Sequence, residues 1–303
     1  MWEGIPQVIA AAVAALAAAT NVTPAAVGHA FRRANLAHAM CPVAETSDVE
    51  LHYPDEAHQI LADIEERSFW FRHRNRVILW MAQRYPCDGP LLDVGGGNGF
   101  QSLALQNVLP SVVMVEPGPD GCRIARARGV RRVVQGQLQD LGLQPDSVGG
   151  VGLFDVLEHV RDAPALLRES ARVLREDGRL YVTVPAFRVL WNEEDDFARH
   201  HRRYTVDTLR AEVESCGLAV DRCAYFFQPV FLPMLILRAL PYRLRRRRGA
   251  LRADAPARTA GHALPGSVER IVMWFLDREQ RTLANGDSPA FGSSVLCVAQ
   301  KHG

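Results

Sequence analysis

The sequence predicts an α/β protein built on a parallel, doubly wound sheet. Between residues 89 and 225, short runs rich in β-branched residues alternate with helical stretches, as in strand–helix–strand units whose strands pair in parallel. A glycine cluster directly follows the first run, at the place where such folds turn from strand to helix and bind ligands. The expected strands are 91–94, 112–116, 132–134, 151–154, 179–184, 219–225 and 294–298.

The composition is that of an ordinary globular protein. The chain has 303 residues, 48% of them hydrophobic, and a formal net charge of +1. This length suits one large domain with attachments or two small domains, and the balanced charge gives no global field that would favour nucleic acid. None of the six cysteines forms a C-x-x-C pair or a zinc-like group with histidine. We therefore expect reduced thiols in a cytoplasmic protein, and no metal site.

The chain divides into a leader and one main domain. Residues 1–45 are Ala-rich, with an apolar run that is too short for a membrane span and lacks the basic flank of a signal peptide. We expect them to be helical or disordered. Residues 46–303 form the main domain, which starts with a helical approach over 46–88. Within it, 225–285 is expected to be a helical insertion or lid, including a loop over 245–265.

The glycine cluster lies in LLDVGGGNGF, after the first expected strand. Glycine is needed where the backbone approaches a ligand closely or takes positive φ. A dinucleotide-binding G-x-G-x-x-G motif fails here, because Phe100 follows where a small residue is required. The pattern D-x-G-x-G-x-G is met in full by Asp93, Gly95, Gly97 and Gly99. The structural alternative is a plain glycine-rich turn.

An acidic residue follows the second expected strand. The run SVVMVEPG ends its strand at Glu116, roughly 20 residues past the glycine cluster, where a carboxylate accepts hydrogen bonds from ribose hydroxyls. An ordinary acid at a strand end is the alternative. The glycine turn, the strand and the acid together favour a ligand that contains a ribose.

These motifs resemble those of class-I S-adenosylmethionine-dependent methyltransferases. The stretch DVLEHV (155–160) closely resembles small-molecule methyltransferases related to quinone-biosynthesis enzymes. Residues 184–205 resemble a subgroup with Leu-Trp, Asp and His-x-Arg-Arg-Tyr after strand five, and FWFRHRN and PAFGSSVLCVAQK match the same subgroup. The resemblance covers about residues 55–301. It implies a Rossmann-like fold with seven strands, the last antiparallel, and S-adenosylmethionine as cofactor.

The resemblance also implies a set of cofactor-binding residues. The glycine loop would pack on the methionine part of the cofactor. Gln137 stands where the family often has Asp, and its carbonyl can still accept from the adenine amino group, while Leu138 would pack on the adenine. Arg74 would meet the cofactor carboxylate. The other residues carried over are Asp93, Gly95, Gly96, Gly97, Gly99, Phe100, Glu116, Pro117, Phe154 and Asp155. One departure lies at Gly149, near the start of strand four, where the family usually has Asp.

Two histidines are candidates for a catalytic base. Methyl transfer from a sulfonium is an in-line displacement that needs proximity and exclusion of water, and a base only where the nucleophile must lose a proton. His159 is expected about one turn into the helix after strand four, and His200 after strand five. The alternative is that His159 only caps its helix or bonds a neighbouring loop. The other histidine of the pair, His201, could face solvent.

Two residues after His200 could orient an anionic or hydroxylated acceptor. Tyr204 offers a hydroxyl and Arg203 a guanidinium fork. Alternatively, both hold the loop together by bonding Glu193 or Asp195.

An apolar run ends in an Arg cluster over residues 225–248. About 17 mostly apolar residues precede the cluster, but a membrane span should be longer and free of Arg238, Pro229 and Pro233. An amphipathic segment on an anionic surface fits better, and it favours a lipid-like acceptor and peripheral membrane contact. The alternative is a helical subdomain that covers the active site. Aromatic residues 69–71 could form a lid over the cofactor or simply pack on the sheet.

The sequence therefore predicts methyl transfer to an O, N or C atom of a small or lipid-like molecule. The alternative is a non-catalytic or non-methylating S-adenosylmethionine-binding protein of the same fold. A nicotinamide dehydrogenase is disfavoured because the glycine spacing fails. Nucleic-acid methylation is disfavoured because residues 154–157 show no N-P-P-Y-like tetrad and the chain has no broad basic face.

Overall fold

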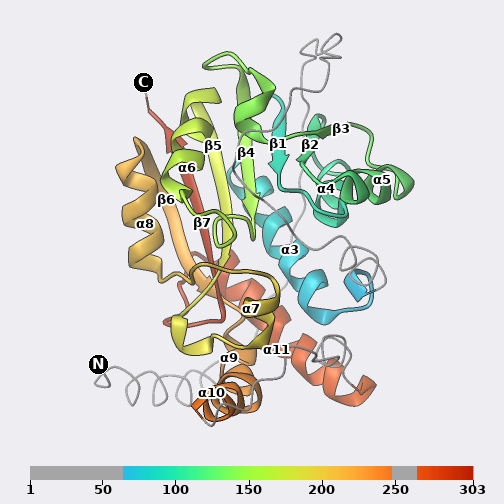
Figure 1. Ribbon diagram of the computed structural model, residues 1–303, viewed down its shortest axis with the longest axis vertical. Helices are drawn as coiled ribbons and strands as arrows, with labels where there is room; N and C mark the ends of the chain where they lie inside the picture. Colours follow the sequence, from blue (N-terminus) through green and yellow to red (C-terminus); the bar gives the residue numbers. More distant parts are fainter. Residues whose placement is uncertain (1–63, 248–264, 303) are drawn as a thin grey trace.

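The computed structural model describes residues 64–247 and 265–302, so the predicted leader, 1–45, lies outside the described residues. A seven-stranded sheet with the order β3-β2-β1-β4-β5-β7-β6 forms its centre (Figure 1). Its last strand in sequence, β7, runs antiparallel to both neighbours, which confirms the predicted fold class. The strands are β1 (Leu91–Val94), β2 (Val112–Glu116), β3 (Val133–Gln135), β4 (Val148–Phe154), β5 (Leu174–Pro185), β6 (Leu218–Phe226) and β7 (Ser294–Lys301).

Helices cover both faces of the sheet, as the alternating sequence predicts. One apolar core holds residues of α6 and α8, and a second holds residues of α3, α4 and α11. The helices are α3 (Phe69–Arg84), α4 (Phe100–Leu105), α5 (Pro119–Ala127), α6 (Ala163–Val173), α7 (Glu193–Phe197), α8 (Val206–Ser215), α9 (Gln228–Met234), α10 (Leu240–Arg247) and α11 (Gly266–Ala284); shorter turns are η1 (Leu138–Leu141), η2 (Arg188–Leu190) and η3 (Leu235–Ala239).

The expected helix directly after Asp155 is wrong. Residues 157–159 form a turn, and α6 begins only at Ala163. Its start is fixed by Asp162, whose carboxylate accepts from the backbone N–H of Ala165 at 3.0 Å, with a proline in the first turn. His159 therefore lies in a tight turn at the carboxyl end of β4, and not in a helix.

The glycines at the other end of β4 have a structural cause. A Cβ at position 149 would lie 2.1 Å from the Asp88 carbonyl oxygen, so only glycine fits where the chain before β1 crosses β4. Gly178 lies in an irregular part of β5, where the pairing with β4 jumps from Leu174 to Arg179. Both features lie away from the carboxyl edge of the sheet.

The helical insertion predicted before the last strand is present. It consists of α9, a π-helical η3, α10 and α11, and Figure 1 shows these helices gathered at one end of the molecule beside α7. A proline at position 233 lies inside α9, so the apolar run is not one straight helix. Within residues 64–247 and 265–302, none of the helices has the length and apolar character needed to cross a membrane.

The insertion is tied to α7 by polar contacts. Arg238 pairs with Glu194 at 2.5 Å, and Arg245 pairs with Glu193 at 3.0 Å. The Tyr242 hydroxyl donates to Asp196 Oδ2 at 2.5 Å. Part of the Arg-rich segment is therefore neutralised within the chain.

Candidate active site

The glycine loop combines tight packing with one open position. Gly95, Gly97 and Gly99 have φ of 71°, 55° and 76°, a region in which residues with a Cβ are strained. A Cβ on Gly96 would lie 2.5 Å from the Met114 side chain, whereas a Cβ on Gly97 would meet no atom within 4 Å. The fold thus needs the neighbouring glycines, and the backbone at Gly97 borders open space.

Glu116 closes the other side of this loop. It ends β2, and its side chain is buried at 7% exposure. Oε2 accepts from the N–H of Gly97 and Oε1 accepts from the N–H of Gly118, both at 2.8 Å. The carboxylate is therefore fixed at the mouth of the loop, at the carboxyl edge of the sheet, where the sequence places it.

Asp93 is buried below the loop. Ser102 donates its hydroxyl to Oδ2, while Oδ1 has no hydrogen-bond partner within the described part of the chain. Burial, and to a smaller extent the charge of Glu116, raise the pKa of Asp93 to about 7. A buried acceptor without a partner costs about 1–3 kcal/mol. This atom fits a ligand that brings a cationic donor, such as the ammonium of S-adenosylmethionine.

Arg74 connects the glycine loop to the end of β4. One guanidinium nitrogen donates to Asp155 Oδ2 at 2.5 Å and the other to Gln101 Oε1 at 3.2 Å. Gln101 in turn donates to the Gly96 carbonyl at 3.4 Å. Asp155 itself has φ 57° and also accepts from the Thr183 hydroxyl at 2.9 Å. Sequence reasoning missed Gln101, whose only signal is a polar side chain in the first turn after the loop.

The residues assigned to the adenine lie after β3. Gln137 is buried and accepts from Gln139 Nε2 at 2.7 Å, and Leu138 is 1% exposed within the main core. Pro117 directly follows Glu116, and its carbonyl accepts from Gln135 Nε2 at 3.5 Å. Contact of these residues with an adenine stays a prediction.

The aromatic run at the start of α3 is divided between two roles. Phe69 is buried in the second core cluster, and Trp70 stacks on Phe227 with the ring centroids 3.8 Å apart. Phe71 meets the ring of Phe100 edge to face at 6.5 Å, beside the glycine loop. The packing interpretation is right for the first two residues, and only Phe71 borders the loop. Phe154, the last residue of β4, is also buried in the second core cluster.

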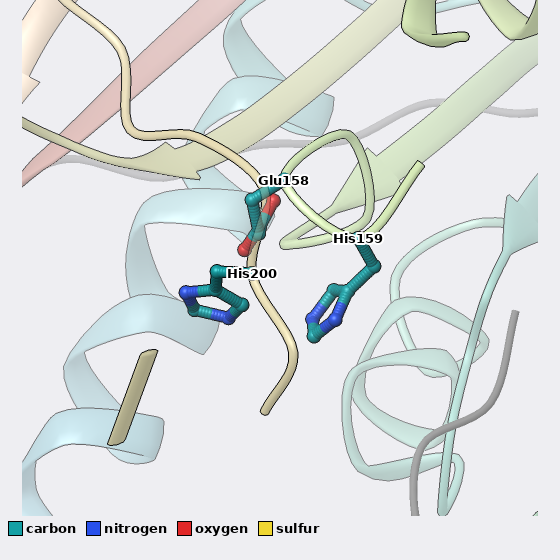
Figure 2. Close-up of side chains that lie close together, drawn as sticks. All are labelled: Glu158, His159 and His200. Atoms are coloured by element: carbon teal, nitrogen blue, oxygen red, sulfur yellow. The ribbon is translucent and has the colours of Figure 1, made fainter. Parts of the chain in front are cut away.

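Beyond β4 and β5, three side chains converge at the same edge of the sheet (Figure 2). Glu158 and His159 come from the turn after β4, and His200 follows α7; one ligand atom from each lies within 4.8 Å of the others. The two imidazole rings meet at 4.6 Å, nearly perpendicular. Burial, and then the neighbouring His200, lower the pKa of His159 to about 4, so this ring is neutral at pH 7. These residues could hold a metal ion.

Asp195 fixes the orientation of His200. The buried carboxylate accepts from His200 Nδ1 at 2.8 Å, from Arg203 Nε and Nη2 at 2.7 and 2.9 Å, and from the N–H of Asn192 at 2.8 Å. Burial would raise the pKa of Asp195, but the bonds from His200 and Arg203 outweigh it and hold the pKa below its ordinary value. An ionised Asp195 makes Nδ1 the donor, and Nε2 of a neutral His200 then carries the lone pair.

The structure also places four neighbouring residues. Arg203 holds the loop through Asp195, as the second interpretation of the sequence states. Tyr204 is 3% exposed in the main core, and its catalytic role stays a prediction. Sequence reasoning passed over Glu158, which is 1% exposed and whose Oε2 lacks a partner within residues 64–247 and 265–302. His201 is exposed, and its N–H donates to the Glu158 carbonyl at 2.8 Å.

The sheet order and the glycine loop define the class of protein. A seven-stranded sheet with an antiparallel last strand, a glycine turn after β1 and an acid at the end of β2 form a Rossmann-like domain. A family model described as a methyltransferase domain matches residues 92–182. This match spans most of β1 to β5 and includes the glycine loop and Glu116.

Known proteins are similar to parts of this chain. The probable S-adenosylmethionine-dependent methyltransferase Rv3030 of Mycobacterium tuberculosis is 30% identical over 174 residues, which is 56% of this chain and 63% of the relative. The match thus spans less than two thirds of that relative. A ubiquinone biosynthesis O-methyltransferase of Xylella fastidiosa is 31% identical over 111 residues, which is 34% of this chain and 45% of the relative.

The fold is also found among solved structures. A chain in the complex between the Haloferax volcanii Trm112 methyltransferase activator and a methyltransferase gives a TM-score of 0.53 at 18% identity. The alignment covers 82% of this chain and 96% of that chain. At this identity the likeness shows the fold alone.

Proposed function

We propose that this chain transfers a methyl group from S-adenosylmethionine to an O, N or C nucleophile of a small or lipid-like molecule. The observation that carries the proposal is the Glu116 carboxylate, buried at the end of β2 and bonded to the N–H of Gly97 at 2.8 Å. This fixed carboxylate, beside the open position of the glycine loop, would accept from the ribose hydroxyls. The bound cofactor supplies a methyl carbon activated by the sulfonium charge.

Each end of the cofactor has candidate partners at the carboxyl edge of the sheet. Asp93 Oδ1 would accept from the methionine ammonium. Arg74 Nε is buried and has no partner among the residues described, so it offers a donor to the methionine carboxylate. Gln137 would accept from the adenine amino group. The remaining proposed cofactor contacts are Gly95, Gly96, Gly97, Gly99, Phe100, Pro117, Leu138, Phe154 and Asp155.

The acceptor would lie at the ends of β4 and β5, where the two histidines meet. His200 Nε2, oriented through Asp195, would take the proton of an acceptor hydroxyl or amine. His159, neutral at pH 7, would face the same group. The remaining barrier is lowered by holding the nucleophile about 3 Å from the methyl carbon in line with the leaving sulfur.

An amphiphilic acceptor is supported by the surface of the insertion. Ile236, Leu237, Leu240 and Leu244 are 56%, 72%, 43% and 55% exposed on η3 and α10, next to the Arg-rich end of α10. Apolar side chains beside cationic ones suit contact with an anionic membrane surface. We therefore propose a cytoplasmic protein that meets its acceptor at that surface.

Calorimetry with purified protein tests the cofactor assignment. We expect S-adenosylmethionine and S-adenosylhomocysteine to bind and NAD not to bind. Glu116→Ala should weaken both adenosyl ligands roughly 10- to 150-fold, the equivalent of losing a charge-assisted hydrogen bond of about 1.5–3 kcal/mol. Glu176→Ala, which removes an exposed acid at the opposite end of the sheet, is the matched control. If wild-type protein binds neither adenosyl ligand, the proposed function is wrong.

A further inference from the structure

We propose that Glu158, His159 and His200 bind a divalent transition-metal ion. Two imidazole nitrogens and one carboxylate oxygen lie within 4.8 Å of one another, and Figure 2 shows the three side chains converging from two segments of the chain. Zn²⁺ with ligand bonds of about 2.1 Å needs ligand atoms about 3.4 Å apart in a tetrahedral site. Small side-chain rotations would bring the cluster to that spacing. The sequence predicted no metal site, because the ligands are brought together only by the fold.

The ligand types indicate which ions the site would accept. Imidazole nitrogen suits Zn²⁺ and its neighbours such as Co²⁺, whereas Mg²⁺ and Ca²⁺ prefer oxygen donors throughout. One carboxylate and two histidines are also a ligand set of catalytic zinc sites, which keep a further position for water or substrate.

The orientation of His200 is the first independent support. Its Nδ1 is held 2.8 Å from Asp195, and Asp195 is itself fixed by Arg203 and Asn192. Metal-binding histidines commonly bond a carboxylate through the nitrogen that does not bind the metal, which fixes the tautomer and the ring orientation. In His200 this leaves Nε2 to bind the ion.

The burial of Glu158 is the second independent support. Its side chain is 1% exposed and Oε2 has no hydrogen-bond partner within the described residues. The nearby cations serve other groups: Arg74 pairs with Asp155, and Arg203 pairs with Asp195. A buried carboxylate without a partner is costly, and a divalent cation at the cluster would supply both a ligand contact and the missing charge.

A role of the ion in catalysis deepens the proposed function and rests on it. An acceptor hydroxyl bound at the open position becomes more acidic, because the cation stabilises the oxyanion. The O–H bond breaks and its proton passes to solvent. The oxygen then forms a bond to the methyl carbon, and the C–S bond breaks with its electron pair remaining on sulfur. Since the ion and a proton compete for His200 Nε2, the bound ion replaces the imidazole base.

Zinc titration of the full-length chain tests the site directly. We expect calorimetry to show about one Zn²⁺ per chain, and Co²⁺ to give visible absorption that Zn²⁺ abolishes. His200→Ala and Glu158→Gln should each weaken Zn²⁺ binding by about tenfold or more, since even residues that only orient metal ligands contribute 10- to 100-fold. His201→Ala, which removes an adjacent exposed imidazole, should leave binding unchanged.

Two further measurements make the outcome decisive. Binding of S-adenosylhomocysteine and the melting temperature show whether each variant remains folded. Absence of Zn²⁺ binding, equal binding by His200→Ala and wild-type protein, or loss of binding in Cys216→Ser with retention in His200→Ala would each overturn the proposal. Zn²⁺ binding without cofactor binding would support the metal site and refute the proposed function. Cofactor binding without Zn²⁺ binding would support the proposed function and refute the metal site.

Discussion

Replacing Asp195 with Asn should destabilise the protein by about 3 kcal/mol. Asp195 is fully buried and accepts two hydrogen bonds from Arg203, whose side chain is 6% exposed, and one from His200. Removing one partner of a buried ion pair costs about 3–5 kcal/mol, because the other charge stays buried. Asn keeps the shape and one acceptor, and Arg203 keeps its bond to the Ala186 carbonyl at 3.0 Å. The low end of that range is therefore expected.

Urea unfolding of wild-type and variant proteins measures this effect. The variant's midpoint should fall while the slope of the transition stays unchanged, since a changed slope would indicate a different unfolded or native state. Glu193→Gln is the matched control on the same helix. Its pair with Arg245 is 37% and 51% exposed, and such pairs contribute about 0–1 kcal/mol. If Asp195→Asn costs no more than the control, Asp195 does not hold this loop together.

Two further predictions concern the cofactor loop and the insertion. The pKa of Asp93 rises from 3.8 to about 7 on folding, first through burial, so its contribution to stability is fully present below pH 4 and is lost as the pH rises through 7. Asp93→Asn should therefore gain stability relative to wild type between pH 5 and pH 8 in urea unfolding, and a pH-independent difference would contradict this; Arg74 and Glu116 stay in place in both proteins. Leu237→Ser should reduce co-sedimentation with anionic vesicles severalfold, because Leu237 is 72% exposed beside the Arg-rich α10. The matched control is Val108→Ser, at an exposed apolar position on another surface; equal binding by both variants would remove the support for a membrane-surface acceptor.

The sequence predicted the elements whose signal is local. The limits of β1 and β2 agree with the expected strands 91–94 and 112–116, since short apolar runs bounded by Pro or Ser and Gly leave little freedom. The bond between Arg203 and Asp195, one of the alternatives offered by the sequence, is present, whereas the bond from His200 to the same carboxylate was not predicted.

Other features depend on information that lies far away in the sequence. The helix after β4 was predicted too early in the sequence. Its actual start is set by the N-cap at Asp162, which follows the apolar run. Glu158 was missed because its burial depends on the segment around His201, whose backbone bonds the Glu158 carbonyl. The role of Trp70 likewise depends on Phe227. This residue directly follows β6, far from Trp70 in the sequence, and only the fold brings the two rings together.

The two halves of the site differ in how they are built. The cofactor half is assembled from the carboxyl ends of β1 to β4 together with Arg74 of α3, so most of its geometry is fixed by the sheet. The acceptor half depends on α7, which bonds the insertion through Glu194 and Arg238 and holds His200 through Asp195. Any displacement of α9 and α10 would therefore reach His200 through one short helix. The insertion also contacts α3, which carries Arg74, because Phe227 at the start of α9 stacks on Trp70 and Glu279 of α11 bonds His73.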